Sequence, residues 1–244
     1  MRFNVTLALA AIMSLTLGLG AACKKRVAVT GAEVKNSEEG RACPKEIGLI
    51  SDGEKNSNQI DTIQDRGGYW YTFLDDAGST VVPEAGKNGG TFAMTPGGAG
   101  GSQFAAHMTG KVAGGGTVYA GMGLNFVDPK GTYDASKYKG ISFKAKVGPG
   151  STGNVRLKVP DNQTDPEGKL CKECFNDFGL DLPLTEQWQE FTIPFTSMKQ
   201  IKTWGSKFEG INPKQLYGMQ FQVNEPGATF DVWVDDIAFT GCEG

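Results

Sequence analysis

Apolar and polar residues alternate along several short segments of the chain, as in strands that bury one face and expose the other. The alternation is clearest in residues 141–147, 155–159, 219–224 and 230–235, and weaker in 103–109, 119–126 and 189–193. Gly, Pro or Asp residues separate these runs, and no long segment has the 3.6-residue period of an amphipathic helix. The pattern predicts an all-β fold, an antiparallel β-sandwich or jelly roll.

The glycine content supports this fold class. The 244 residues include 35 glycines without a collagen-like period, which indicates many tight turns. Segments 86–101 and 114–116 are rich in Gly, and we expect them to form surface loops or ligand-gating loops outside the core. Residues 43–242 are predicted to form a single domain, because no repeat or second domain boundary is visible.

The first 22 residues have the layout of a secretory signal peptide. Arg2 precedes an apolar run over residues 5–19, and small residues follow at positions 20–22. The apolar run is too short for a transmembrane helix, which needs about 20 apolar residues. The chain is therefore expected to be exported, either to a bacterial cell envelope or into the medium.

Cys23 follows the signal segment in a sequence that resembles the bacterial lipoprotein cleavage box, except that Gly20 stands where Leu is usual. We expect Cys23 to carry a lipid anchor and residues 23–42, which are polar and aperiodic, to form a flexible tether. The alternative is plain cleavage after Ala22, which would leave Cys23 as a free thiol. If Cys23 is lipidated, we expect the lipid anchor to be the chain's only contact with a membrane.

The charge of the chain argues against nucleic acid as a partner. The formal net charge is −3, and the one basic cluster, at residues 24–26, lies beside the cleavage site. We expect a monomer.

Four cysteines remain if Cys23 is lipidated, an even number that suits an exported protein. Three pairings are possible, and we prefer Cys43–Cys242 with Cys171–Cys174, because the first and last strands of a jelly roll commonly lie close together. A zinc site is disfavoured, since the chain has one histidine and no second C-x-x-C. A thioredoxin-type site is also disfavoured. It would need a helix after the C-x-x-C in a βαβ unit, whereas the C-x-x-C here follows a loop-like segment in an all-β pattern.

Catalytic signatures are sparse. His107 is the only imidazole, no G-x-S-x-G elbow accompanies it, and it lies on the strand face opposite Ala106 and Met108. Glycoside hydrolysis needs only two spaced carboxylates, but the E-x-D-x-x-E run of laminarinase-type jelly rolls is absent. We expect a non-enzyme, with a glycoside hydrolase or lyase as the first alternative and an envelope adhesion or assembly module that binds a protein as the second.

Six motifs in order resemble a known family. They are residues 48–54, 66–71 (RGGYWY), 133–145 (YDASKYKGISFKA), Trp188 with 191–195, 204–205, and 230–237 (FDVWVDDI). Together they are similar to carbohydrate-binding domains related to family-11 modules, galactose-binding-like jelly rolls of the type found in bacterial surface lipoproteins. The similarity covers residues 48–239 and departs from the family at Gly53, where Phe is usual.

The resemblance implies binding of a polysaccharide, such as a β-glucan, without cleavage. It also implies a structural Ca²⁺ held by acidic residues of the first and last strands. Carried over by position, these are Glu54 with Asp235 or Asp236, and less directly Asp52. Calcium takes six to eight oxygen ligands, so carboxylates at this place are chemically suitable.

Sugar sites combine flat aromatic rings with polar groups that bind hydroxyls. The predicted ligand-binding residues are therefore aromatic, amide, imidazole or charged: Arg66, Trp70, Tyr71, Asp75, His107, Gln220 and Gln222. Gln220 and Gln222 share the polar face of one strand. Of the neighbours Trp70 and Tyr71, one should face the core, since adjacent strand residues point to opposite sides.

Overall fold

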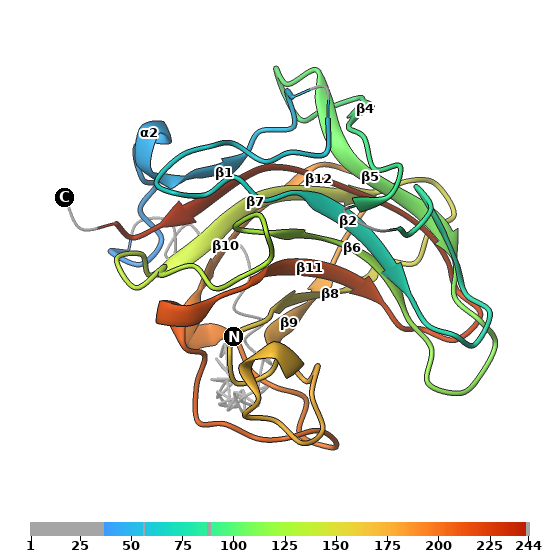
Figure 1. Ribbon diagram of the computed structural model, residues 1–244. Helices are drawn as coiled ribbons and strands as arrows, with labels where there is room; N and C mark the ends of the chain where they lie inside the picture. Colours follow the sequence, from blue (N-terminus) through green and yellow to red (C-terminus); the bar gives the residue numbers. More distant parts are fainter. Residues whose placement is uncertain (1–36, 56, 87–88, 243–244) are drawn as a thin grey trace, which may run out of the picture.

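The computed structural model describes residues 37–242 except 56, 87 and 88, and in it the chain forms two antiparallel sheets packed face to face (Figure 1). The larger sheet has the order β10-β7-β12-β5-β3, with β1 paired to β12 and β4 paired to β5. Its strands are β1 (Leu49–Ser51), β3 (Thr80–Val82), β4 (Thr95–Pro96), β5 (Phe104–Lys111), β7 (Gly140–Val147), β10 (Gln189–Pro194) and β12 (Thr229–Thr240). The predicted all-β sandwich is confirmed.

The smaller sheet has the order β2-β6-β11-β8-β9. Its strands are β2 (Trp70–Leu74), β6 (Ala120–Asn125), β8 (Asn154–Val159), β9 (Phe178–Pro183) and β11 (Gly218–Val223). The helical elements are short: α2 (Lys45–Gly48) and the 3₁₀ turns η2 (Pro166–Gly168), η3 (Phe195–Ser197) and η4 (Pro213–Gln215). In Figure 1 the two sheets arch in the same direction, so that the outer face of the smaller sheet lies inside the curve.

The seven alternating segments correspond to β5, β6, β7, β8, β10, β11 and β12, and their apolar residues meet between the sheets. β12 continues further than the alternation predicts. Its pairing with β7 shifts register between Asp235 and Ala238, and Asp236 has a positive φ of 50°. Because the bulge adds a residue to β12, the side chains of Ile237 and Phe239 point into the core, where both are buried.

The expectation that residues 86–101 lie outside the core was wrong in part. Phe92, Met94 and Ala99 are buried, and the ring of Phe92 stacks on Trp70 with centroids 5.6 Å apart. The segment therefore supplies core side chains between its glycine turns. Residues 114–116 are exposed, as predicted.

Arg66, predicted to bind ligand, is instead a buried structural residue with 1% exposure. Its guanidinium donates to the hydroxyls of Tyr133 (2.7 Å) and Tyr138 (3.2 Å), and to the carbonyls of Ile47 and Leu49 (2.8 Å each). It also lies 5.2 Å from the ring centre of Phe239. A charge removed from water needs such partners, and here they join the start of β1 to the 133–138 loop and to β12.

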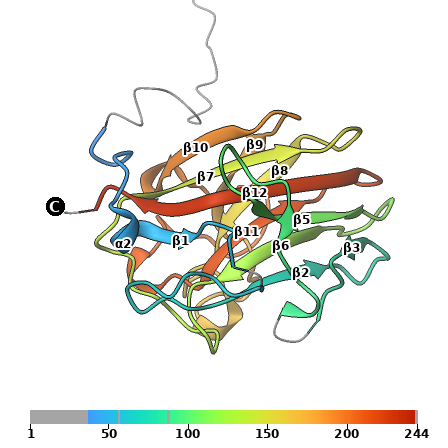
Figure 2. The same cartoon turned by 90° about the horizontal axis from the view of Figure 1, so that it is seen from above.

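The Cys171–Cys174 disulfide is formed, whereas the predicted Cys43–Cys242 bond is not. Figure 2 shows β1 alongside β12, and this pairing brings the two free thiols to one seam. There the Cys242 amide donates to Cys43 Sγ at 3.2 Å. Burial raises the pKa of the Cys43 thiol to about 12, which disfavours the thiolate needed for disulfide formation.

The predicted signal segment, Cys23 and residues 24–36 of the predicted tether lie outside the described residues, and these assignments stay predictions. The last residues of the tether were assigned wrongly, because Ala42 pairs with Thr240 and the Glu39 carbonyl accepts from the Thr240 hydroxyl at 2.8 Å, which attaches them to β12. Within the part of the chain that the structure describes, no helix is long and apolar enough to cross a membrane.

The Arg66 contacts predict a large loss of stability for Arg66→Met. Removing the guanidinium takes a donor from the Ile47 and Leu49 carbonyls and a partner from the Tyr133 and Tyr138 hydroxyls, so we expect a loss of about 3–5 kcal/mol in the free energy of unfolding. Arg41→Met is the matched control, because Arg41 is exposed and makes one long contact, 3.5 Å, with the Cys242 carbonyl. Urea titrations that find equal, small losses for both variants would contradict this role.

Candidate functional site

Two rows of side chains run across the outer face of the five-stranded sheet. Strand pairing aligns Tyr71 with Gly123, Gly123 with Gln220, and Gln220 with Lys158. A second, parallel row lies two residues away along each strand. It contains Phe73, Gly121, Gln222, Arg156 and Asp181. Because neighbours within a row lie on adjacent strands, each row is a continuous band of chemically different groups.

The two glycines of β6 leave room for neighbouring side chains to lie over the middle of this face. A Cβ on Gly121 would lie 2.4 Å from the Phe73 ring, and one on Gly123 would lie 2.8 Å from Gln220 Cγ and 3.1 Å from the Tyr71 hydroxyl. Neighbouring side chains therefore close over β6, where any larger residue would collide with them. The result is a floor of ring atoms and amide groups.

The polar groups of the face are bonded to one another. Gln220 Nε2 donates to the Tyr71 hydroxyl at 3.0 Å, and Lys158 Nζ donates to Gln222 Oε1 at 3.2 Å. Burial raises the pKa of Tyr71 to about 12, so its hydroxyl stays protonated and can still donate to a ligand. Arg156 donates to Asp181 at 3.0 Å and to the Lys199 carbonyl at 2.8 Å.

Loops at the edges turn this face into a groove, called here the outer groove. One part, about 300 Å³, is lined by residues that include Tyr69, Lys130 and Tyr217. The other, about 540 Å³, is lined by residues that include Phe73 and Trp204. Tyr71, Phe175, Asp177 and Gln220 line both parts, so the two are continuous.

Asp177 lies at the junction of the two parts and is 2% exposed. Its Oδ2 is 2.9 Å from Lys158 Nζ, and its Oδ1 is buried without a hydrogen-bond partner among the described residues. Buried carboxylate oxygens are normally satisfied, so an unsatisfied one beside a groove marks a place where a ligand hydroxyl could donate.

Tyr71, Gln220 and Gln222 are the predicted ligand residues that the structure brings together in the outer groove. Trp70 is not among them: it is 1% exposed, faces the core and donates from Nε1 to Ser51 Oγ. Asp75 is not available either. Its carboxylate accepts from the amides of Ala77 and Tyr119, both at 2.7 Å, and from the Ser79 hydroxyl, which makes it a turn clamp.

His107 has the predicted orientation but lies in the other sheet. It extends from the outer face of the seven-stranded sheet, stacked on Trp233 at 3.7 Å, and its Nε2 contacts Asp231 Oδ1 at 2.9 Å. Burial lowers the pKa of His107 by more than the Asp231 contact raises it. The core separates it from the outer groove, so it cannot join Gln220 in one site.

Several groove residues were not predicted from the sequence. Arg156 and Lys158 alternate with buried apolar residues, so the pattern that revealed Gln220 and Gln222 could have revealed them. Phe175, Asp177 and Trp204 lie in loops without periodicity.

The predicted calcium ligands divide into two pairs. Asp52 forms an ion pair with Lys45 at 2.8 Å, and Asp236 forms one with Lys144 at 2.6 Å. Glu54 Oε1 instead accepts from the Phe104 amide at 3.0 Å. Between residues 37 and 242, apart from the three undescribed positions, no group of three or more His, Cys, Asp or Glu side chains is arranged to hold a metal ion.

Glu54 and Asp235 nevertheless flank one position. Gly53 directly precedes Glu54 and has a φ of +74°, and a Cβ there would be 2.6 Å from the Phe104 carbonyl and 3.2 Å from Asp235 Oδ1. Asp235 is 2% exposed, and burial raises the pKa of its carboxyl to about 6. Two carboxylates and a carbonyl at this seam are the hard oxygen donors that Ca²⁺ prefers.

The sequence model of carbohydrate binding domain 30 matches residues 93–241, which is more than half of the chain. This span includes β5 to β12 and most of the outer groove. No curated protein matches the chain by sequence.

Solved structures of carbohydrate-binding modules share the fold. The family 11 module of the cellulosomal cellulase Lic26A-Cel5E of Clostridium thermocellum aligns over 80% of this chain and 95% of its own, with 16% identity and a TM-score of 0.54. A family 11 module from the same organism, in complex with a β-1,3-1,4-mixed-linked tetrasaccharide, aligns over 80% and 97%, with 17% identity and a TM-score of 0.54. A family 30 module aligns over 81% and 98%, with 15% identity and a TM-score of 0.50.

Proposed function

The chain belongs to the carbohydrate binding domain 30 family, and we propose that it binds a polysaccharide, without cleaving it, in the outer groove of its five-stranded sheet. The observation that carries this proposal is the pair of rows across that sheet. Each row has an aromatic ring at one end, a glycine in the middle, and an amide followed by a cationic side chain toward the other end.

This arrangement suits the chemistry of a sugar chain. A pyranose ring has apolar C–H faces, which pack against aromatic rings such as Tyr71 and Phe73. Its hydroxyls both donate and accept, so they suit the amides of Gln220 and Gln222 and the unsatisfied Asp177 Oδ1. The groove is open along the sheet and can accept an extended chain.

We further propose a β-glucan as the ligand, with mixed β-1,3-1,4 linkages as the first to test. The support is the mixed-linked tetrasaccharide bound to the family 11 module of the same fold. The hydrolase or lyase alternative has less support, since the family is one of non-catalytic domains. Asp177, the carboxylate at the groove junction, contacts Lys158 rather than a second carboxyl group.

Substitutions in the outer groove test the proposed function. We expect Gln220→Ala combined with Gln222→Ala to lower affinity for mixed-linked β-glucan about 10–100-fold, because each lost hydrogen bond contributes about 0.5–1.5 kcal/mol. Affinity gel electrophoresis and calorimetry would measure it. The control is His107→Ala on the opposite sheet, which should bind like the wild type. Equal losses in both, or no retention of the wild type on any polysaccharide, would contradict the proposal.

We also propose that Ca²⁺ binds at the seam between the first and last strands, with Glu54 and Asp235 as side-chain ligands. Both carboxylates lie around Gly53, and the Phe104 carbonyl is beside them. A cation there would compensate the buried charge of Asp235. Because these residues lie on separate segments, the ion would fasten β12 to the segment after β1.

Millimolar CaCl₂ is expected to raise the melting temperature of the wild type by about 5–10 °C, the shift that saturation well above Kd gives in a domain of this size. Asp235→Asn should abolish the calcium-dependent increment. Asp236→Asn, which changes the adjacent carboxylate paired with Lys144, should keep it. If MgCl₂ gives the same increment, or Asp235→Asn retains it, the site is not at this seam.

Surface display is proposed from the sequence around Cys23. A lipid on this residue would hold the module at the envelope while the polar tether keeps the groove free for a glycan. In expressing bacteria, the wild type should partition into the detergent phase of a Triton X-114 extraction and Cys23→Ser into the aqueous phase. Identical partitioning of the two proteins would exclude a lipid anchor at this position.

A further inference from the structure

Two large aromatic side chains remain exposed at one side of the outer groove. Phe175 is 57% exposed and Trp204 is 45% exposed, although rings of this size are usually buried. Both line the larger part of the groove, together with Tyr71, Phe73 and Gln222. Exposed aromatic rings at the margin of a groove are typical of a surface that receives a ligand.

Phe175 is held on a tightly constrained loop. The Cys171–Cys174 disulfide precedes it directly, and its backbone amide donates to the Thr164 carbonyl at 2.8 Å. Its φ of 69° lies in the left-handed region, which an L residue with a bulky side chain adopts only when its surroundings impose it. The loop therefore determines the direction in which the ring points.

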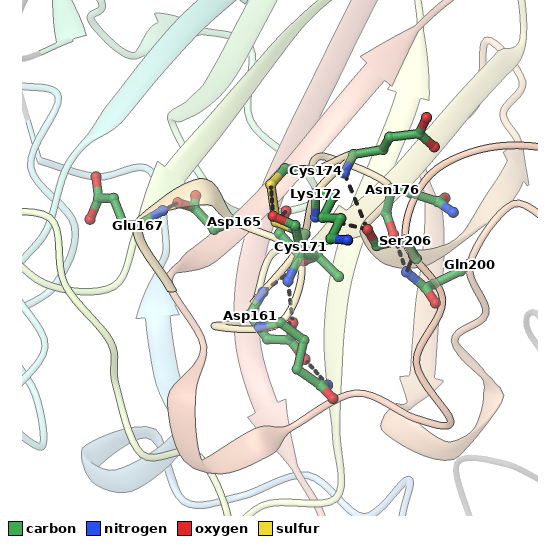
Figure 3. The surroundings of a disulfide bond; sticks show 12 residues. Asp161, Asp165, Glu167, Cys171, Lys172, Cys174, Asn176, Gln200 and Ser206 are labelled. Carbon is green, nitrogen blue, oxygen red and sulfur yellow. Dashed lines mark hydrogen bonds between the residues drawn. A yellow bond between two sulfur atoms is a disulfide. The ribbon is translucent and has the colours of Figure 1, made fainter. Parts of the chain in front are cut away.

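Trp204 lies on the neighbouring loop, and Asn176 joins the two loops. Asn176 Nδ2 donates to the carbonyls of Ile201 (2.9 Å) and Trp204 (2.7 Å), and its Oδ1 accepts from the Ile201 amide (3.0 Å). Ser206 adds a second link, because its hydroxyl oxygen accepts from the amides of Lys172 and Glu173. Figure 3 shows Asn176, Ser206 and Gln200 gathered beside the disulfide.

We propose that Phe175 and Trp204 form an additional sugar subsite at this side of the outer groove, with Cys171, Cys174 and Asn176 as its positioning residues. The ligand there is a further pyranose unit of the glycan bound in the groove, whose C–H faces contact the two rings. This inference rests on the proposed function. Two rings held in place before binding lose little conformational freedom when the sugar arrives, so they add affinity at low entropic cost.

The subsite predicts an effect that depends on oligosaccharide length. We expect Phe175→Ala and Trp204→Ala each to lower affinity about tenfold for mixed-linked β-glucan oligosaccharides of six or more units. Short oligosaccharides that occupy only the smaller part of the groove should bind Trp204→Ala as tightly as the wild type, because Trp204 lines only the larger part. Phe175→Tyr and Trp204→Phe keep a flat ring and should bind like the wild type. Gln220→Ala should weaken the binding of short and long oligosaccharides alike.

The outcomes separate the two proposals. If the wild type binds no glucan, the proposed function fails and the subsite fails with it. If the wild type binds while Phe175→Ala and Trp204→Ala match it at every length, the subsite alone is wrong. Equal weakening at all lengths would also overturn the subsite, because it would show that the two rings act on the whole groove.

The positioning role is tested by opening the disulfide. In a Cys43→Ser, Cys242→Ser background, a water-soluble phosphine transfers two electrons to the Cys171–Cys174 sulfurs, which take up two protons while the phosphine gains the oxygen of water. Affinity for long oligosaccharides should fall about 3–10-fold, within the usual range for ordering loops and side chains on binding. The melting temperature is measured in parallel.

Cys171→Ser combined with Cys174→Ser should reproduce this loss and make the protein insensitive to the phosphine. Asn176→Ala should give the same length-selective loss with the disulfide intact. Reduction that leaves the affinity for long oligosaccharides unchanged, in a protein whose cysteines are shown by mass to be open, would overturn the positioning role.

Discussion

The register of the five-stranded sheet determines both which side chains form the core and which form the outer groove. Strand residues alternate between two faces, so one pairing decides for the whole sheet which side chains meet the core and which meet solvent. Pairing Tyr71 with Gly123, and Gly123 with Gln220, puts a ring, a glycine and an amide in one row, so that the ring and the amide meet over the glycine. A slip of one residue along β11 would turn Gln220 into the core and expose Met219, which is buried. The core and the outer groove are therefore consequences of the same hydrogen-bonded ladder.

Alternation in the sequence was sufficient for much of the fold and for part of the site. It predicted the strand and the exposed face of Gln220 and Gln222, because their apolar neighbours require the opposite face. It could not say which sheet a strand joins. His107 was therefore assigned to the correct face of its strand, but that strand lies in the other sheet. It also could not choose between Trp70 and Tyr71, because either of two adjacent aromatic residues can occupy the core-facing position of the alternation. The structure places Trp70 in the core.

The remaining errors have a common physical cause. Arg66 and Asp75 are polar residues of the kind that bind hydroxyls, but backbone groups of the folded chain occupy their hydrogen-bonding capacity. Such partners lie far away in sequence or depend on a turn, so no pattern of residue types reveals them. Phe175, Asp177 and Trp204 illustrate the reverse case: loops without periodicity carry groove residues because a disulfide and an amide side chain hold them in place. Tertiary contacts therefore removed some predicted ligand residues and supplied others.

Amide chemical shifts would show whether the glycan lies over β6, on the ring and amide side chains that cover Gly121 and Gly123. In a titration of the ¹⁵N-labelled protein with a mixed-linked β-glucan tetrasaccharide, we expect the largest shifts at Gly121 and Gly123 and at the side-chain amides of Gln220 and Gln222. His107 and Trp233, on the opposite sheet, should remain unchanged. Shifts centred on His107 and Trp233 while the β6 glycines stay unperturbed would contradict glycan binding in the outer groove.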